Sequence, residues 1–235
     1  MMRTLVRLLA QSPVAFDGLR WILEGGYANH RKLIHSSIGQ LTVQVLDIGC
    51  GTGIYATCFS ADKYTGVDIS PAYVDRCKRR CPKHTFQVMD ATQLDFGDAT
   101  FGAAMISGVL HHLDDDLALR VCREVQRVLT PGGKLLVCED IPTTNRWNLI
   151  GSTIHRLDLG EHIRAPEGYR DILTRSFTVN STELLRSGVM DYVAFRCTKD
   201  PARGDDSLAE AVREGTAPAA IPTDTMVEQV GGIRP

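Results

Sequence analysis

VLDIGCGTG, at residues 45–53, joins an apolar run to three glycines at alternate positions. The apolar residues around Asp47 are typical of the end of a buried strand. Gly49, Gly51 and Gly53 remove side chains where this strand must turn into the next element, so another group can approach the backbone closely. We therefore expect a strand followed by a turn that binds a ligand.

Strand-like and helix-like segments alternate on both sides of this turn. The expected strands are at residues 41–48, 63–70, 84–91, 101–110 and 134–140, and the expected helices start at about residue 53 and span 71–81 and 115–129, with a turn at 130–133. Such alternation implies right-handed crossovers and a parallel sheet covered by helices on both faces. The sequence therefore predicts an α/β fold with a doubly wound, Rossmann-like and mostly parallel sheet.

The rest of the chain divides into an N-terminal region, an insertion, a hairpin and a tail. Residues 1–40 show helical spacing of apolar residues and are expected to form a lid in front of a domain at 41–199. Within that domain, residues 141–177 are polar and are interpreted as a helical cap insertion. Two strands joined by a tight turn follow, and they would give seven strands, one of them antiparallel. Residues 200–235 are rich in Ala, Gly, Pro and charge, so we expect a tail with little fixed structure.

The charge balance of the chain argues against nucleic acid as a partner. Its 235 residues include 26 Lys and Arg against 28 Asp and Glu, a net charge of -2. This offers no overall electrostatic footprint for nucleic acid or for an anionic membrane. Arg7 interrupts an apolar stretch too short for a signal-peptide core, and no later stretch is long enough to cross a bilayer. We therefore expect a cytoplasmic protein without stable membrane insertion.

Seven cysteines are scattered through strand-like and helix-like segments. We interpret them as reduced thiols that pack as small apolar side chains. Cys77 and Cys81 lie four residues apart on a predicted helix, a spacing that allows metal binding, but no second pair with ligand spacing accompanies them. No metal site is predicted.

Two classes of ligand suit a glycine-rich turn after the first strand of such a sheet: a dinucleotide bound through its pyrophosphate, or a nucleoside-type ligand without phosphates. The dinucleotide pattern G-x-G-x-x-G, begun at Gly49, requires glycine at a position that is Ile54. Asp47 would also repel a pyrophosphate, whereas it can accept hydrogen bonds through water from an ammonium group. The turn therefore favours a cationic ligand without phosphates.

Acidic residues also follow the next two predicted strands. Asp68 lies about 20 residues after Asp47, the offset at which an acidic side chain reaches ribose hydroxyls in this topology. Asp90 ends the third strand. Because ligands bind outside the carboxyl ends of parallel strands, the three aspartates are expected around one crevice.

Five segments follow one another along this region: VLDIGCGTG (45–53), TGVDIS (65–70), VMDATQLDF (88–96), FGAAMISGVLHHLDD (101–115) and LTPGGKLLVCE (129–139). In order and interval they resemble the motifs of the class I S-adenosylmethionine-dependent methyltransferases. The resemblance covers about residues 41–140 and implies S-adenosyl-L-methionine as the cofactor. It also implies that Asp47 and the glycines of the turn face the methionine end of that cofactor.

The resemblance further implies which residues contact the cofactor at the ends of the first four strands. They are Asp47, Gly49, Cys50, Gly51, Gly53, Asp68, Ile69, Asp90, Ala91, Ser107 and Gly108. In this assignment Asp68 binds both ribose hydroxyls, Ile69 packs on adenine, and Asp90 holds the adenine amino group with help from the next backbone unit. Ser107 and Gly108 would lie beside the sulfonium.

Transfer of a methyl group from a sulfonium is an in-line displacement, so the enzyme has to align the acceptor and exclude water. An acceptor of high pKa also needs a base. His111 and His112 are candidates because histidine titrates near neutral pH and both follow the fourth strand at the rim of the same crevice. The alternative is that this pair contacts the cofactor or caps the next helix.

The N-terminal helices and the insertion are left to shape an acceptor pocket. Tyr27, His30, Arg146 and His155 are candidate substrate residues, and a solvated helical face is the alternative for the last two. Residues 107–110 read Ser-Gly-Val-Leu, unlike the Asn/Asp-Pro-Pro-Tyr of the amide and adenine N-methylating members, which disfavours that class. We therefore expect a small-molecule or lipid-like acceptor, methylated at oxygen or carbon.

Other functions stay open at this point. One is an enzyme that binds S-adenosylmethionine but catalyses a non-methylating step, such as a cyclisation or a decarboxylation. Another is a catalytically silent partner subunit that binds the cofactor, although its motifs would be expected to degenerate. A nicotinamide oxidoreductase is opposed by Ile54 in place of the third glycine of the dinucleotide pattern.

Overall fold

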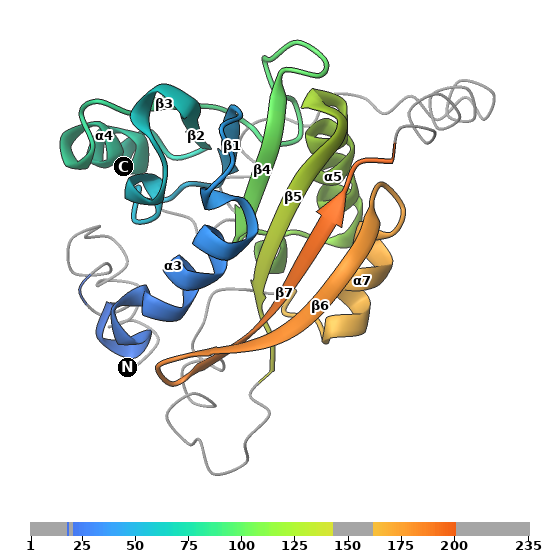
Figure 1. Cartoon of the computed structure of the whole chain (residues 1–235). Helices are drawn as coiled ribbons and strands as arrows, with labels where there is room; N and C mark the ends of the chain where they lie inside the picture. Colours follow the sequence, from blue (N-terminus) through green and yellow to red (C-terminus); the bar gives the residue numbers. More distant parts are fainter. Residues whose placement is uncertain (1–17, 19–20, 143–161, 201–235) are drawn as a thin grey trace.

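The computed structural model describes residue 18 and residues 21–142 and 162–200, and its centre is one seven-stranded sheet with the order β3-β2-β1-β4-β5-β7-β6 (Figure 1). The strands are β1 (Val45–Ile48), β2 (Tyr64–Asp68), β3 (Thr85–Val88), β4 (Phe101–Ser107), β5 (Leu129–Asp140), β6 (Thr178–Ser187) and β7 (Met190–Thr198). The first five pair in parallel, and β7 is antiparallel to both of its neighbours. The predicted doubly wound sheet with one antiparallel strand is confirmed.

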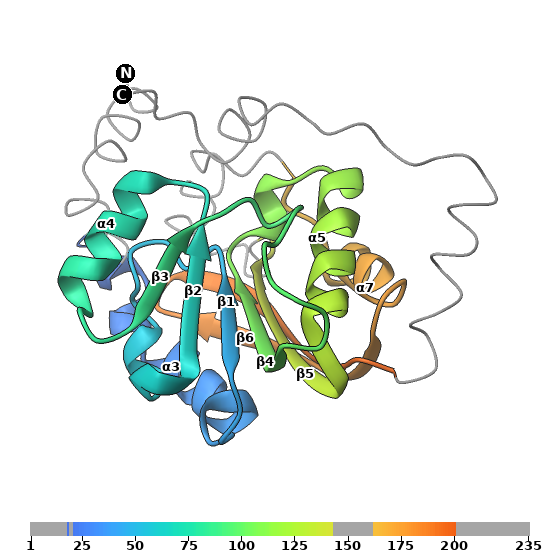
Figure 2. The ribbon, with the colours of Figure 1, turned by 90° about the horizontal axis from the view of Figure 1, so that it is seen from above.

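Helices cover both faces of this sheet (Figure 2). They are α3 (Ala28–Ile34), α4 (Pro71–Arg80), α5 (Asp115–Val128) and α7 (Pro166–Leu173). Apolar side chains of α3 and α4 pack with one face of β1, β2 and β4, and those of α5 and α7 pack with the other face. The α5 helix starts where expected because the side chain of Asp114 accepts a hydrogen bond from the Leu117 backbone at 2.9 Å, a helix N-cap.

The helix expected from about residue 53 does not form, and this prediction is wrong. The chain between β1 and β2 instead makes two 3₁₀ turns, η3 (Ala56–Cys58) and η4 (Ala61–Lys63). Its backbone bonds run from residue i+3 to residue i, as from Gly53 to Cys50 and from Ala56 to Gly53. Such bonds give a tighter and shorter turn than an α-helix.

The turn expected at residues 130–133 lies inside the bounds of β5. Phe101 pairs with Leu129 and Ala103 pairs with Lys134, so four residues of β5 bulge against a single residue of β4. Pro131 cannot donate a ladder hydrogen bond, and Gly132 has a φ of 73°, which together favour this irregularity.

The part of the predicted cap insertion that the structure describes is not a separate cap. Tyr169, Ile172 and Leu173 of α7 are buried in the same core as α5. Residues 143–161 lie outside the described residues, so the cap itself stays a prediction there. The helix α7 is therefore part of the layer that covers the sheet.

The β6–β7 hairpin holds the N-terminal part of the chain. The Asn29 side-chain amide donates to the Arg186 carbonyl at 2.6 Å, and the Ser187 hydroxyl donates to the Glu24 carbonyl at 2.7 Å. These bonds join segments 157 and 163 residues apart in sequence. They fix the segment before β1 against the far end of the sheet.

Candidate functional site

The glycine turn lies at the carboxyl end of β1, and side chains of other segments lie directly against two of its glycines. A Cβ atom on Gly49, whose φ is 64°, would lie 2.4 Å from Cγ2 of Val109. One on Gly53 would lie 3.1 Å from Sγ of Cys77. At Gly51, with φ 54°, no heavy atom lies within 4 Å of that position. Protein atoms thus fill the space beside the first and third glycines, and space for a ligand remains beside Gly51.

Asp68, at the end of β2, faces this turn. Its Oδ2 accepts a hydrogen bond from the Gly51 backbone at 2.8 Å, and its Oδ1 accepts one from the Ser70 backbone at 2.9 Å. Burial raises the pKa of Asp68 to about 6, although these two bonds act in the opposite direction. An ionised carboxylate offers about four acceptor sites, so two remain for a ligand.

Asp47 lies on β1 beside the same turn and is buried. Its Oδ2 accepts a hydrogen bond from the Tyr64 hydroxyl at 2.6 Å. Burial raises the pKa of Asp47 to about 7, the bond from Tyr64 lowers it, and the charge of Asp68 raises it. The two buried carboxyls therefore make an acidic site whose charge depends on pH near neutrality.

The remaining predicted cofactor residues also follow the carboxyl ends of neighbouring strands. Ile69 and Ala91 are partly buried against the core, and Oδ1 of Asp90 accepts a bond from the Thr92 backbone at 2.8 Å. Gly108 follows β4, with its N–H bonded to the Cys138 carbonyl of β5 at 2.9 Å. Ser107, the last residue of β4, is half-buried, and Cys50 is buried with its N–H on the Val67 carbonyl. Most of the predicted set therefore gathers at one edge of the sheet.

His111 lies in the turn η5 (Leu110–His112) and is held by Glu139 at the end of β5. Its Nδ1 lies 2.9 Å from Oε2 of Glu139, and the other oxygen of that carboxylate accepts the backbone N–H groups of Val109 and Leu110. The ring turns its Cε1 toward Gly108, 3.7 Å from where a Cβ on that glycine would lie. The imidazole is thus oriented by a buried carboxylate and placed beside the end of β4.

His112 lies next to this ring and is less buried. The two ring centroids are 4.0 Å apart, with an angle of 43° between the planes. The guanidinium of Arg164 donates to the Leu110 and Leu113 carbonyls at 2.7 Å each, which fixes the turn that carries both histidines. His111, which the carboxylate orients, is the better placed of the two for a defined chemical role.

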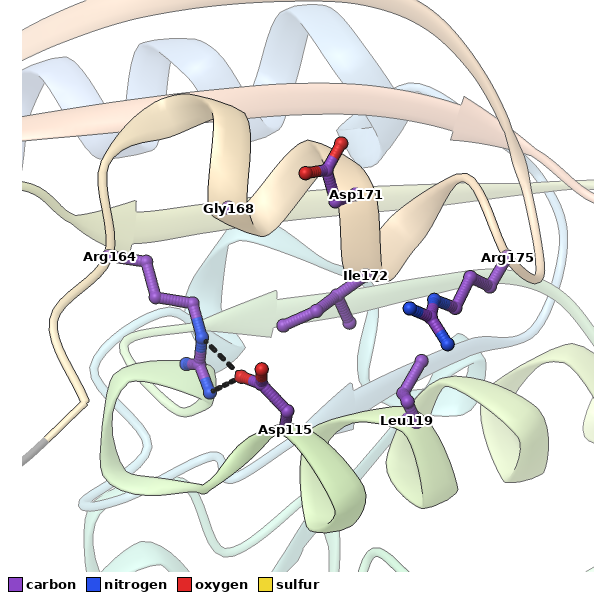
Figure 3. A pocket seen from close by; sticks show the side chains of 7 residues that line it. All are labelled: Asp115, Leu119, Arg164, Gly168, Asp171, Ile172 and Arg175. Carbon is purple, nitrogen blue, oxygen red and sulfur yellow. Dashed lines mark hydrogen bonds and ion pairs between the residues drawn. The ribbon is translucent and has the colours of Figure 1, made fainter.

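An open depression of about 350 Å³ lies between α5 and α7 (Figure 3). It is lined by Asp115, Leu119, Arg164, Gly168, Asp171, Ile172 and Arg175. Arg164 spans its end and pairs with Asp115 at 2.7 Å. None of the predicted cofactor residues lines it among the residues the structure describes, and neither Tyr27 nor His30 does, so it is separate from the site at the glycine turn.

Two of the four predicted substrate residues lie in the described part of the chain. Tyr27 and His30 are buried, and their rings pack with Tyr55, which follows the glycine turn, at 5.8 Å between centroids for each pair. His30 also meets Tyr192 of β7 edge-on at 4.5 Å. Arg146 and His155 lie outside the described residues. The segment that contains Tyr27 and His30 therefore packs against the loop after β1, and its role as a lid stays a prediction.

Sequence reasoning missed three functional partners in this site. Tyr64 bonds Asp47, Glu139 orients His111, and Arg164 holds the turn around that histidine. A signal was present for Glu139, because an acidic residue directly follows the apolar strand run of β5. A carboxylate buried at that position requires hydrogen-bond partners, which here are His111 and the backbone of residues 109–111.

Neither a membrane-spanning helix nor a metal cluster is found in the part of the chain that the structure describes. No helix at 21–142 or 162–200 is both long and apolar enough to span a bilayer. Within the same ranges, no group of three or more His, Cys, Asp or Glu side chains has the arrangement of a metal site.

Comparison with known proteins gives consistent matches. The model of a family described as a methyltransferase domain matches residues 45–133. N-demethylindolmycin N-methyltransferase of Streptomyces griseus is 36% identical over 106 residues, which cover 42% of this chain and 44% of the relative. Probable tRNA methyltransferase 9B of Mus musculus is 36% identical over 94 residues, covering 40% and 21% of the two chains.

The fold has solved counterparts as well. The N-methyltransferase NodS of Bradyrhizobium japonicum WM9, solved in complex with S-adenosyl-L-homocysteine, aligns with a TM-score of 0.60 at 20% identity, over 74% of this chain and 87% of that one. The chain spans less than half the length of the curated relatives named above.

Proposed function

Since the chain contains a class I S-adenosylmethionine-dependent methyltransferase domain, we propose that it transfers a methyl group to a small-molecule or lipid-like acceptor. S-adenosylmethionine, the cofactor of this class, supplies an activated methyl group on a sulfonium when bound. The observation that carries the proposal is the approach of Asp68 to Gly51, at 2.8 Å, across the ends of two neighbouring strands. A buried carboxylate beside a turn that is open at Gly51 suits a cationic nucleoside.

The residues present fit such a cofactor. Asp68 has acceptor capacity left for two ribose hydroxyls, and Gly51 leaves room beside the backbone. Asp47 adds a second buried carboxyl on the methionine side, which suits a positively charged ligand. Asp90 and Ala91, past the end of β3, are the proposed contacts of the adenine, together with Ile69. Ser107 and Gly108 are proposed to border the sulfonium.

His111 is the proposed general base for an acceptor hydroxyl or carbon acid. The bond between its Nδ1 and Glu139 leaves Nε2 as the nitrogen that can take a proton. Glu139 would stabilise the imidazolium that forms, as a carboxylate beside histidine does in other general-base pairs. His112 is proposed to pack beside this ring rather than to take the proton.

Oxygen or carbon remains the proposed methylated atom, because a base oriented in this way is most useful for acceptors of high pKa. Tyr27 and His30 are proposed to line the acceptor side, and Arg146 and His155 are proposed substrate residues on the insertion. Nucleic acid is not the proposed acceptor, since the chain carries a net charge of -2.

The test is to incubate the purified protein with methyl-labelled S-adenosylmethionine and a cell extract separated into metabolite, lipid, protein and nucleic-acid fractions. Label in the metabolite or lipid fraction is expected, and mass spectrometry then identifies the acceptor. Label on RNA, DNA or protein would contradict the proposed acceptor class. Cofactor binding without any labelled product would instead favour a non-methylating reaction.

A further inference from the structure

The loop that follows the glycine turn lacks the helix that would satisfy its own backbone. Three of its carbonyl groups, those of Cys50, Gly53 and Tyr55, accept bonds from the residue three positions later. The Ala56 carbonyl likewise accepts a bond from the Phe59 backbone N–H. The carbonyls between these positions need other donors, because buried or half-buried carbonyls left without a partner are costly.

Side chains from the two flanking helices supply those donors. Arg31 of α3 donates to the Ile54 carbonyl at 2.8 Å and to the Thr57 hydroxyl at 3.0 Å. Arg80, the last residue of α4, donates to the Thr52 carbonyl at 3.0 Å.

A thiol completes the set of donors. Sγ of Cys77, on α4 as well, donates to the Gly51 carbonyl at 3.1 Å. Every carbonyl from residue 50 to residue 56 therefore has a partner, and side chains of α3 and α4 provide three of the seven.

The arginines have the chemistry for this task. A guanidinium carries five N–H donors in a fixed plane, so Arg31 can bond a carbonyl and a hydroxyl at once. A bond from a charged donor contributes more than a neutral one. Two such side chains, one from α3 and one from α4, bond a loop that has no α-helix of its own.

We propose that Arg31 and Arg80 are positioning residues that hold the glycine turn in its ligand-ready form. The inference rests on the proposed function, because the ligand is S-adenosylmethionine. Neither arginine is assigned a contact with the reacting atoms. Their effect passes through the loop that contains Gly51, whose N–H is already directed at Asp68.

The test is calorimetric titration of the parent protein and its variants with S-adenosyl-L-homocysteine, the demethylated cofactor. Arg31→Met and Arg80→Met are each expected to weaken binding roughly 5- to 30-fold, since each removes charge-assisted bonds to the loop. Arg31→Lys is expected to recover part of the affinity, because an ammonium keeps the charge and loses the planar fork. The double variant should be weaker than either single one.

Matched controls lie on the same helices. Lys32→Met and Arg79→Met remove exposed cations from α3 and α4, and both are expected to bind like the parent. Amide hydrogen exchange is measured on all the proteins without ligand. Faster exchange in the Arg31 and Arg80 variants should be confined to residues 51–59, with the β6–β7 hairpin unchanged.

The outcomes separate the two ideas. If the parent protein does not bind the ligand, the proposed function fails. If the parent binds and the arginine variants bind equally well, the positioning role is overturned. Faster exchange throughout the sheet in the variants, Arg31→Lys included, would also overturn it, because the arginines would then serve the whole fold.

Discussion

Nδ1 of His111 lies 2.9 Å from Oε2 of Glu139, and both side chains are buried. The second oxygen of the same carboxylate holds the Val109 and Leu110 backbone. One carboxylate thus fixes both the orientation of the ring and the path of the chain that carries it. Replacing Glu139 should therefore disturb both the ring and the backbone turn, a larger structural effect than replacing His111, which it supports.

Replacing the proposed base separates chemistry from binding. His111→Gln is expected to lower kcat roughly 10²- to 10⁴-fold, the range of a lost general base, with little change in the KM for the cofactor. His112→Gln is expected to have a much smaller effect. Steady-state kinetics on the identified acceptor measure both, and the exposed His35→Gln provides the control. Equal losses at positions 111 and 112 would contradict the assignment.

Glu139→Gln tests the supporting carboxylate. The variant is expected to lose activity and also about 1–3 kcal/mol of unfolding free energy, because three backbone donors and the ring lose a charged acceptor. Chemical denaturation measures the second effect. Full activity in this variant would show that the ring needs no carboxylate.

Asp68→Asn tests the proposed ribose contact. It is expected to weaken binding of S-adenosyl-L-homocysteine by about 1–3 kcal/mol, because two charge-assisted bonds to hydroxyls become neutral. Asp75→Asn removes an exposed carboxylate from α4 and serves as the matched control. If calorimetry shows unchanged affinity in the Asp68→Asn variant, the ribose does not bind at Asp68.

Cofactor binding should depend on pH. The pKa of Asp47 is raised to about 7 and that of Asp68 to about 6, chiefly by burial. A cationic ligand needs both groups ionised, so affinity is expected to be greatest well above pH 7 and to fall as the pH drops through these values. Tyr64→Phe removes a bond that lowers the pKa of Asp47, so the fall should begin at a higher pH. A flat affinity between pH 8 and pH 6 is incompatible with this account.

The same pKa shift gives the stability of the ligand-free protein the opposite pH dependence. An aspartate whose pKa rises from 3.8 to about 7 on folding binds more protons in the folded state, so the unfolding free energy falls as pH rises across that window. Asp47→Asn is therefore expected to raise the Tm above pH 7 while weakening cofactor binding. Thermal melts at pH 5 and pH 8 test this, and the gain should be larger at pH 8.

The packing of Gly49 on Val109 is testable by a double substitution. Gly49→Ala is expected to cost about 2–4 kcal/mol of unfolding free energy, from a left-handed φ and a contact 2.4 Å from Cγ2. In a Val109→Ala background the cost should fall to that of the backbone alone, about 1–2 kcal/mol. An equal cost in both backgrounds would show that the contact is unimportant.

Periodicity predicted the strands, α5 and the hairpin because each depends on local sequence. Asp68 could also be placed, since its distance along the chain from Asp47 follows from the topology. The absence of a helix after Gly53 could not be predicted in this way. Some carbonyls of that loop are bonded by Arg31 and Arg80, which come from other helices and are distant in sequence.

Side-chain partners on neighbouring strands could not be predicted from the sequence for the same reason. Tyr64 bonds Asp47 on the neighbouring strand β1, and Glu139 bonds His111 in the turn that follows the neighbouring strand β4, so both contacts depend on how the strands pair. The spacing of residues along one segment does not reveal which residue of another segment such a side chain bonds, even where, as at Glu139, the acidic residue itself stands out.

The bonds from Asn29 and Glu24 to the β6–β7 hairpin set an order of assembly. During synthesis residues 24–29 leave the ribosome well before the hairpin, whose bonding residues follow more than 150 residues later. The parallel strands can pair before that point and give α3 an apolar face to pack on, whereas the bonds between residues 24–29 and the hairpin cannot yet form. The contacts of residues 24–29 with the β6–β7 hairpin are therefore expected to form last, once residues 178–198 have been translated.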